Sequence, residues 1–278
     1  MRRLLTTVLL ALAAVTTVTA QGNWGLRSGI GIEKGIAKGL DAELEAKYHT
    51  TDDFSRNDRW SVGLSMSKRL YRNKAKTFNV KAGLGYKYLH VYNKWTTKFK
   101  GDETLGVENG LDPQYYASKE YDFNMNDPYE DSRHRVTASL QAAVELGRFK
   151  FSWRESYQYT HTDSASFTKE KYRYDSSEKK WNVKTEPDGK AAQDKQLLRS
   201  RIGAEYNIPN WKYDPFISYE LFNNLDKGLR TEKSRINVGI EFSLNKKHNF
   251  EVSYLWQNNH DDDEPAGSFV CLGYKFEL

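Results

Sequence analysis

Arginine and glutamate side chains recur at every second position inside apolar runs of this sequence, and they are its main candidates for chemistry. In one such run, Arg199 and Arg201 alternate with Leu198, Ser200 and Ile202. Guanidinium and carboxylate groups at this spacing either pair with each other in a polar interior or bind charged solutes. The residues assigned to such a charge network or solute path are Arg135, Glu145, Arg154, Arg199, Arg201, Glu205, Glu220, Arg235, Glu241 and Glu251.

The alternation itself predicts how these charges are positioned. The chain ends in a run whose apolar residues all fall on one face: Val270, Leu272, Tyr274, Phe276 and Leu278. Successive side chains of a β-strand point to opposite faces, so such a run makes one apolar face and one polar face. Similar runs precede it at about 24–32, 40–48, 60–66, 78–88, 136–144, 149–159, 198–206, 217–221, 236–244 and 250–256.

Most of these runs have about 9–12 residues, which is the length that a tilted strand needs to cross a bilayer. We therefore predict an all-β fold, an antiparallel up-and-down transmembrane β-barrel of about 10–12 strands. Counting back from Leu278 gives ten strands, and Trp24–Ile32 would add an eleventh. Bacterial barrels have even strand numbers, so either a twelfth strand is missed or the N-terminal segment is not a full member of the wall. The alternative fold is a soluble antiparallel sandwich or lipocalin-like barrel.

The connections between the runs alternate in length. Long polar segments at about 93–131 and 161–195 are predicted to be extracellular loops, because short turns and long loops sort to opposite ends of such barrels. Within the second loop, Tyr172, Tyr174, Trp181 and Val183 indicate a hairpin in the stretch Phe167–Glu186.

The first residues predict export. Arg2 and Arg3 precede an apolar run that is too short to span a bilayer, and small residues follow up to Ala20. We expect residues 1–20 to be a cleaved signal peptide and residues 21–278 to form the barrel.

Composition excludes several classes of protein. The formal net charge of +5 falls to +3 without Arg2 and Arg3, which is too small an excess to indicate nucleic-acid binding. A mean hydropathy of −0.80 is compatible with a membrane barrel, because only alternate residues of each strand meet lipid. The single cysteine, Cys271, excludes an intrachain disulfide.

The charged face of the strands allows two interpretations. An Arg–Glu network could fill and rigidify a narrow barrel as a structural element. The same residues could instead line a narrow pore, in which Arg135, Arg199, Arg201 and Arg235 attract small anionic or sugar-acid solutes. One misfit is Glu155, which alternation turns toward lipid unless a β-bulge or a position near the rim moves it.

An outer-membrane hydrolase acting on lipid or lipopolysaccharide is the alternative from a different class. His134 lies beside Ser132 and Asp131, but no spaced Ser/His motif emerges, so we expect no enzyme. No pair of histidines has metal-ligand spacing on one face, and neither a metal nor a cofactor is expected.

Short motifs connect the chain to a known family. They are Arg199-Ser-Arg201 with Glu205-Tyr206, Pro215–Phe222, Arg235 with Val238-Gly239, Arg133-His-Arg135, and Trp24 near the start. Over nearly the whole mature chain these motifs resemble the outer-membrane β-barrel family catalogued as the domain-of-unknown-function family numbered twenty-four ninety. The resemblance implies an outer-membrane barrel and implies no activity.

Localisation and partners follow from this interpretation. We expect a monomeric, porin-like protein in the outer membrane of a Gram-negative bacterium, surrounded by lipid and lipopolysaccharide. The barrel-assembly machinery would recognise its C-terminal strand, and no nucleic-acid partner is expected.

Overall fold

The computed structural model describes residues 24–245, 247–259 and 266–278. The predicted signal peptide at residues 1–20 lies outside this part. The chain folds as two compact units. Among the described residues, those within 24–89, 135–160 and 195–278 form the barrel unit, and those within 90–134 and 161–194 form the second unit.

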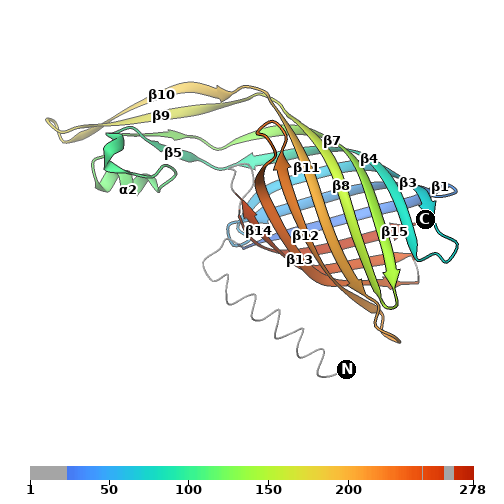
Figure 1. Ribbon diagram of the computed structural model, residues 1–278. Coiled ribbons are helices and arrows are strands. Elements are labelled where there is room, and N and C mark those ends of the chain that lie inside the picture. Colours follow the sequence, from blue (N-terminus) through green and yellow to red (C-terminus); the bar gives the residue numbers. More distant parts are fainter. Residues whose placement is uncertain (1–23, 246, 260–265) are drawn as a thin grey trace. The chain divides into compact units, whose positions relative to one another are not determined.

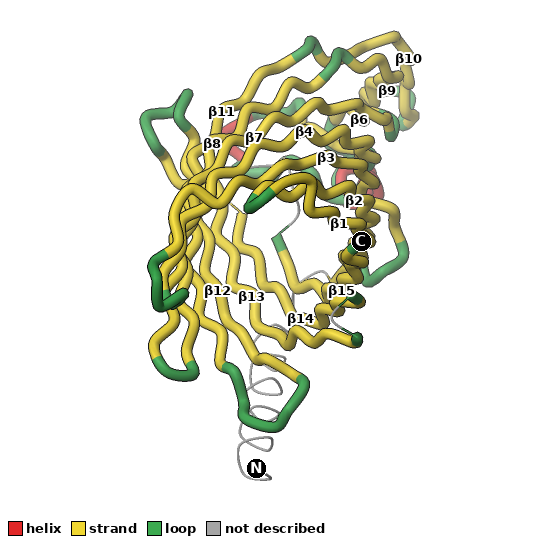
Figure 2. Tube along the Cα trace, turned by 90° about the vertical axis from the view of Figure 1, so that its right-hand side faces the viewer, coloured by secondary structure: helices red, strands yellow, loops and turns green. Residues whose placement is uncertain are grey.

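Eleven strands of the described residues form one closed sheet, which confirms the predicted all-β barrel of about 10–12 strands (Figures 1 and 2). Around the barrel the order is β1-β15-β14-β13-β12-β11-β8-β7-β4-β3-β2. The strands are β1 (Trp24–Ala37), β2 (Leu40–Thr51), β3 (Arg56–Arg72), β4 (Phe78–Asn93), β7 (Tyr129–Leu146), β8 (Phe149–Thr162), β11 (Gln193–Tyr206), β12 (Tyr213–Asn224), β13 (Arg230–Leu244), β14 (His248–Asn259) and β15 (Gly267–Glu277).

The barrel closes through a parallel pair of strands. β1 and β15 run in the same direction, with Trp24 opposite Ser268 and Glu33 opposite Glu277, whereas every other strand pair with a determined register in this sheet is antiparallel. An up-and-down order with an odd number of strands forces this arrangement, because the first and last strands then point the same way. The segment from Trp24 onward is therefore a full member of the wall.

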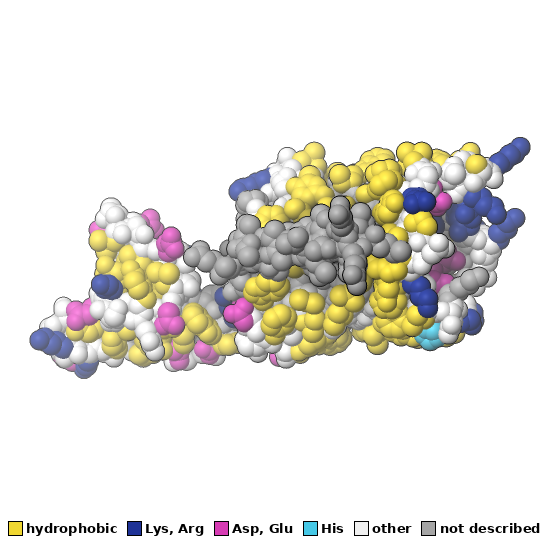
Figure 3. All heavy atoms as spheres, turned by 90° about the horizontal axis from the view of Figure 1, so that it is seen from below, with side chains coloured by type: hydrophobic (Ala, Val, Ile, Leu, Met, Phe, Trp, Pro, Cys, Tyr) yellow, Lys and Arg dark blue, Asp and Glu magenta, His cyan; other side chains and the backbone are white. Residues whose placement is uncertain are grey.

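The two faces of the barrel wall differ sharply in chemistry. Outward-pointing apolar side chains remain exposed, with Leu84 61% and Leu64 55% accessible, and Figure 3 shows hydrophobic side chains gathered over the outer wall. Side chains at the alternating positions point into the lumen and are mostly polar, such as Gln257 and Ser253, which are almost fully buried. A water-soluble sandwich would bury its large apolar residues, so the exposed apolar wall favours the transmembrane alternative.

Glu155 stays on the outer wall, between Trp153 and Tyr157 on β8. Its neighbours Arg154 and Ser156 face the lumen, so the alternation continues through this segment without the bulge that would turn Glu155 inward. The indole Nε1 of Trp153 donates to Glu155 Oε1 at 2.9 Å, and the Ser200 hydroxyl donates to Oε2 at 2.8 Å. These two donors satisfy the carboxylate and reduce the cost of its outward position.

The second unit has a sheet and a core of its own. Its four strands run in the order β10-β9-β6-β5, with β5 (Thr96–Phe99), β6 (Phe123–Asn126), β9 (Ala165–Asp175) and β10 (Lys180–Lys190). The predicted hairpin is present, because β9 pairs with β10 along its whole length. The short helices η1 (Glu103–Leu105) and α2 (Pro113–Ser118) complete the unit, and Phe99, Tyr116 and Phe123 form its core. The two segments expected to be separate extracellular loops therefore contribute strands to one sheet.

Both helices are short. Within the described ranges, no helix is long and apolar enough to cross a membrane.

The exposed apolar wall generates a depth-dependent prediction. We expect Leu64→Arg, near the middle of β3, to lower the free energy of unfolding in a bilayer by about 2–4 kcal/mol, because hydrocarbon solvates a guanidinium poorly. The matched control is Leu70→Arg on the same wall near the end of β3, where the expected loss is about 0–1 kcal/mol. Urea unfolding in phospholipid vesicles measures both losses. Equal losses at the two positions would contradict a hydrocarbon-covered wall.

Candidate solute site in the barrel lumen

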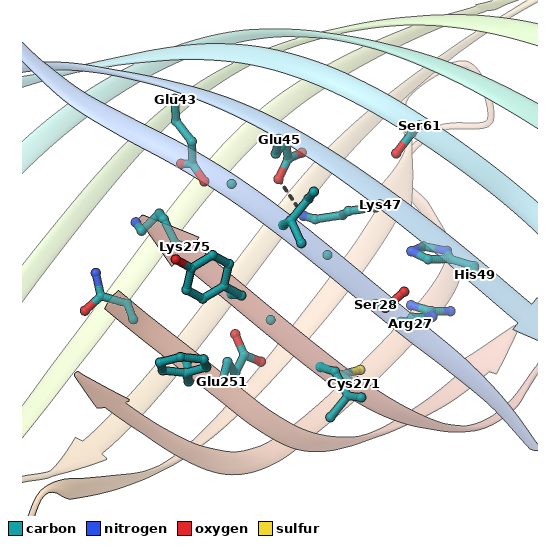
Figure 4. A pocket seen from close by; sticks show the side chains of 18 of the residues that line it. Arg27, Ser28, Glu43, Glu45, Lys47, His49, Ser61, Glu251, Cys271 and Lys275 are labelled. Carbon is teal, nitrogen blue, oxygen red and sulfur yellow. Dashed lines mark ion pairs between the residues drawn. The ribbon is translucent and has the colours of Figure 1, made fainter. Parts of the chain in front are cut away.

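Described residues of the barrel line three adjoining cavities in its lumen. The seam cavity, of about 640 Å³, lies beside β1 and β15 and is lined by Arg27, Glu251 and Lys275 among others (Figure 4). The central cavity, of about 460 Å³, includes arginines of β7, β8, β11 and β13 in its lining. The side cavity, of about 200 Å³, lies near Lys150 and Glu205. Volumes of several hundred cubic ångströms are sufficient for small organic solutes.

Nine of the ten residues assigned from the sequence line these cavities. The central cavity is lined by Arg135, Arg154, Arg199, Arg201, Glu220 and Arg235. The seam cavity is also lined by three of these, Arg135, Arg199 and Arg235, and in addition by Glu241 and Glu251. The side cavity is lined by Arg154, Arg201, Glu205 and Glu241. The tenth, Glu145, is exposed near the end of β7 and lines none of the three.

Glu220 lies at the centre of the arginine cluster. Its Oε1 accepts a hydrogen bond from Arg199 Nη2 at 2.8 Å and one from Arg154 Nη2 at 3.4 Å. The charges of Arg201 and Arg235 also act on this carboxylate, which is only 8% exposed. One buried carboxylate thus lies within electrostatic reach of four guanidinium groups, so the cluster keeps a positive excess.

Neutral groups hold several of these arginines in place. Gln257 Oε1 accepts from Arg235 Nε at 2.7 Å and from Arg27 Nη2 at 3.0 Å, and Gln158 Oε1 accepts from Arg199 Nη1 at 3.0 Å. An amide oxygen orients a guanidinium without cancelling its charge. The supporting amides therefore fix the positions of the cations and leave their field in the lumen.

A buried aromatic ring adds further support. Phe222 is 2% exposed, and the charged ends of Arg199, Lys233 and Arg235 lie 4.7, 4.4 and 4.7 Å from its ring centroid. Cation–π contacts at these distances stabilise a positive charge without supplying a negative one. Phe222 therefore lets three cations gather at one place in the wall.

The lysines of the central cavity surround a second carboxylate. Glu45 forms ion pairs with Lys47, at 2.7 Å, and with Lys87. Together with Glu220 it is one of the two carboxylates that line the central cavity. The cationic residues that line this cavity are Lys47, Lys87, Arg135, Arg154, Arg199, Arg201 and Arg235.

Some donors of this cluster are unused. The Nε–H groups of Arg154 and Arg199 are buried and have no hydrogen-bond acceptor within the described residues. Arg201 lines the same cavity and donates no hydrogen bond to any described residue. A solute carrying carboxylate or phosphate oxygens would supply the acceptors that these guanidinium groups lack.

Ion pairs are more balanced elsewhere in the lumen. Lys275 Nζ lies 2.6 Å from Glu33 Oε2, and Lys150 Nζ lies 2.6 Å from Glu205 Oε2. Both pairs lie toward the Leu278 end of the barrel, since Glu33 and Lys275 are near the ends of β1 and β15 and Lys150 and Glu205 flank the β8 and β11 termini. The positive excess is thus concentrated around the central cavity.

The residues considered for a hydrolase have partners in the second unit. Asp131 accepts hydrogen bonds from Arg133 Nε at 2.7 Å and from Asn93 Nδ2 at 2.9 Å. The carboxylate of Asp163 lies 3.6 Å from His134 Nε2. Across the described part of the chain, no group of three or more His, Cys, Asp and Glu side chains could hold a metal ion.

The sequence reasoning missed several lumen residues. The same alternation of side chains could have assigned Arg27, Lys87 and Gln257 to the lumen, because their sequence neighbours point outward. Phe222 could not have been found in this way, because an aromatic residue on the polar face resembles an ordinary strand residue until its three cations are known.

Comparisons with known proteins give a family and a distant structural likeness. A family model described as "Protein of unknown function (DUF2490)" matches residues 24–266. No curated protein matches the chain. Among solved structures, the translocator domain of autotransporter NalP from Neisseria meningitidis is similar, with a TM-score of 0.45 and 12% identity, covering 82% of this chain and 71% of that chain.

The arginine cluster predicts a strong dependence of stability on Glu220. We expect Glu220→Gln to lower the free energy of unfolding by about 3 kcal/mol, because it leaves buried guanidinium groups without their carboxylate. Adding Arg199→Gln should restore part of this loss, since it removes one of the uncompensated charges. Urea unfolding of the single and double variants measures the coupling. Additive losses would show that Glu220 does not hold the cluster together.

Tyr172 of the second unit predicts a pH dependence at alkaline pH. A hydrogen bond to Glu170, with partial burial and the Glu170 charge as further causes, raises the pKa of Tyr172 from 10.0 to about 12. The folded unit then holds a proton that the unfolded chain releases, so its stability is full below pH 10 and is lost as the pH rises toward 12. We expect Tyr172→Phe to remove this part of the decline, as measured by thermal unfolding across that range. Identical pH profiles for the two proteins would contradict the assignment.

Proposed function

Because this chain belongs to the DUF2490 family, whose function is unknown, we propose a function from the barrel itself: it is an outer-membrane β-barrel whose basic lumen binds and passes small anionic solutes. The observation that carries this proposal is the lining of the central cavity, where seven cationic side chains face two carboxylates. A low-dielectric wall focuses such an excess and concentrates anions in the lumen.

Placement in the outer membrane is supported by the exposed apolar wall and by aromatic residues such as Trp153, Tyr157 and Phe149 on it. Strands that cross a bilayer must pair all their backbone groups, and a closed barrel leaves no free edge. Under this proposal lipid and lipopolysaccharide surround a monomeric barrel, and β15 is the strand that the barrel-assembly machinery engages.

Passage of solutes is supported by the continuity of the cavities. The seam and central cavities share the lining residues Glu45, Lys87, Arg135, Arg199 and Arg235, so a solute in one is in contact with the wall of the other. The unused donors of Arg154 and Arg199 offer binding sites for carboxylate or phosphate oxygens along this path. Sugar acids and small organic anions fit both the charge and the volume.

Ion selectivity in planar bilayers tests the proposed function. We expect resolvable conductance steps with a reversal potential that indicates anion selectivity, and weaker selectivity at about 1 M salt, where the screening length falls to about 3 Å. Arg201→Glu should lower the anion-to-cation permeability ratio on the order of tenfold, because Arg201 lines the cavity without bonding to its wall.

The matched control is Lys34→Gln, which removes a positive charge from an exposed position near the end of β1. This variant should keep the wild-type selectivity. An absence of conductance steps, or cation selectivity in the wild-type protein, would overturn the proposed path and favour a purely structural charge network.

A further inference from the structure

The closing pair of strands separates a charged cavity from an apolar hollow. On the lumen side is the seam cavity, and on the outer wall lies a hollow of about 550 Å³ with an almost entirely apolar lining. Both include Ser28, Gly29, Leu272 and Gly273 in their linings. At this place β1 and β15 alone separate the seam cavity from the outer hollow.

The outer hollow is built from small residues between aromatic ones. Ser28 and Ala46 leave space over β1 and β2, while Tyr48 and Trp60 bound one side and Phe250 bounds the other. Ser28 is opposite both Tyr48 and Leu272, which places the hollow over the closing pair itself. Under the proposed membrane placement, an apolar hollow of this size is suited to an acyl chain.

The pair of strands at this place is less reinforced than an antiparallel pair with side chains on both strands. It is the parallel pair, and parallel pairing is slightly weaker per residue than antiparallel pairing. On the lumen face Gly29 is directly opposite Gly273, so no side chains bridge the strands there. Glycine also weakens strand interiors because it adds no packing.

Side chains close the pair on either side of these glycines. The guanidinium carbon of Arg27 lies 4.0 Å from the ring centroid of Phe269, and Lys275 forms its ion pair with Glu33 at 2.6 Å. Between these two contacts the lumen face of the pair is held by the backbone. A separation of β1 from β15 at the glycines would connect the seam cavity with the outer hollow.

The charges of the seam cavity indicate which end of a ligand it would take. Its cationic residues are Arg27, Lys47, Arg59, Lys87, Arg135, Arg199, Arg235 and Lys275, against the carboxylates of Glu43, Glu45, Glu241, Glu251 and Glu277. Arg27, Lys47 and Lys275 are the cations nearest the glycine pair, because Arg27 and Lys275 are each two residues from one of its glycines and Lys47 is opposite Gly29. Lys275 is already paired with Glu33. Lys47 shares Glu45 with Lys87, which leaves Arg27 and Lys47 as the cations for a head group. An anionic head group is favoured on this side.

We propose that the β1–β15 pair is a lateral binding site for a single-chain anionic amphiphile of the fatty-acid class, with its head group against Arg27 and Lys47 and its acyl chain in the outer hollow. This site goes beyond the proposed solute path, because its ligand enters from the bilayer and needs separation of two strands. It depends on the barrel being in a membrane and not on ion conduction.

Photolabelling of the full chain in phospholipid vesicles tests the site. The probe is a fatty acid with a diazirine near its methyl end, and the labelled residues are identified by mass spectrometry. We expect saturable labelling concentrated on β1, β2, β3 and β15, displaced by unlabelled fatty acid. A fatty alcohol with the same diazirine should label these strands about tenfold less at equal concentration.

A reversible lock tests whether the strands must separate. Ser28→Cys with Leu272→Cys, in a chain that also carries Cys271→Ser, places two thiols on directly opposed residues, at a spacing that a disulfide can bridge. Oxidation should lower labelling about tenfold, and reduction should restore it in the same protein. The matched control joins Ile202→Cys and Tyr219→Cys between β11 and β12, where oxidation should change nothing.

Two outcomes would overturn the site. One is labelling spread evenly around the outer wall, which indicates ordinary lipid contact, and the other is labelling that persists when the β1–β15 lock is oxidised. Conductance recorded on the oxidised chain separates this site from the solute path. Unchanged conductance with lost labelling supports a distinct lateral site, and lost conductance with persisting labelling contradicts it.

Discussion

Each strand of a closed sheet must point its side chains alternately into the lumen and out of the wall, and the chemistry of this protein follows from that constraint. Apolar residues at one set of positions give an outer wall that leaves Leu64 and Leu84 more than half exposed. Charged residues at the other set are forced into a confined interior, where they must be paired, hydrated or bound to a solute. The arginine cluster around Glu220 follows from this alternation, and the single carboxylate of Glu220 compensates only part of the positive charge around it.

The wall and the lumen support each other energetically. Backbone pairing around the barrel removes every free edge, and the buried amides of Gln158 and Gln257 orient arginines on the neighbouring strands. Because these amide acceptors are neutral, they hold the arginine side chains in place without cancelling the positive charge of the guanidinium groups. The closing pair is an exception, since Gly29 and Gly273 contribute backbone without side chains. The seam cavity beside this pair shares Arg135, Arg199 and Arg235 with the central cavity, so the parallel pair lies next to part of the same positive charge.

Much of this arrangement could be predicted from the sequence because a period of two leaves few choices. The alternation predicted the strands of the barrel and left eleven among the possible strand numbers. Of the ten charged residues that it assigned to the lumen, nine line the lumen cavities. What the alternation could not give is which side chains meet once the strands have paired. The pairing of Arg199 with Glu220 and the cations on Phe222 are of this kind. The segments expected to be loops instead fold around Phe123 and Tyr172, because their aromatic residues meet only after the two segments come together.

The central claim is that hydrocarbon covers the outer wall while water and solutes reach the lumen, and spin labels along β3 test it most directly. Labels placed one at a time from Ser61 to Met66, in vesicles, report their access to oxygen, which partitions into lipid, and to a nickel chelate, which stays in water. The account predicts a period of two, with oxygen access at Val62, Leu64 and Met66 and nickel access at Ser61 and Ser65. Equal access to the nickel chelate at all positions, or no alternation, would contradict it.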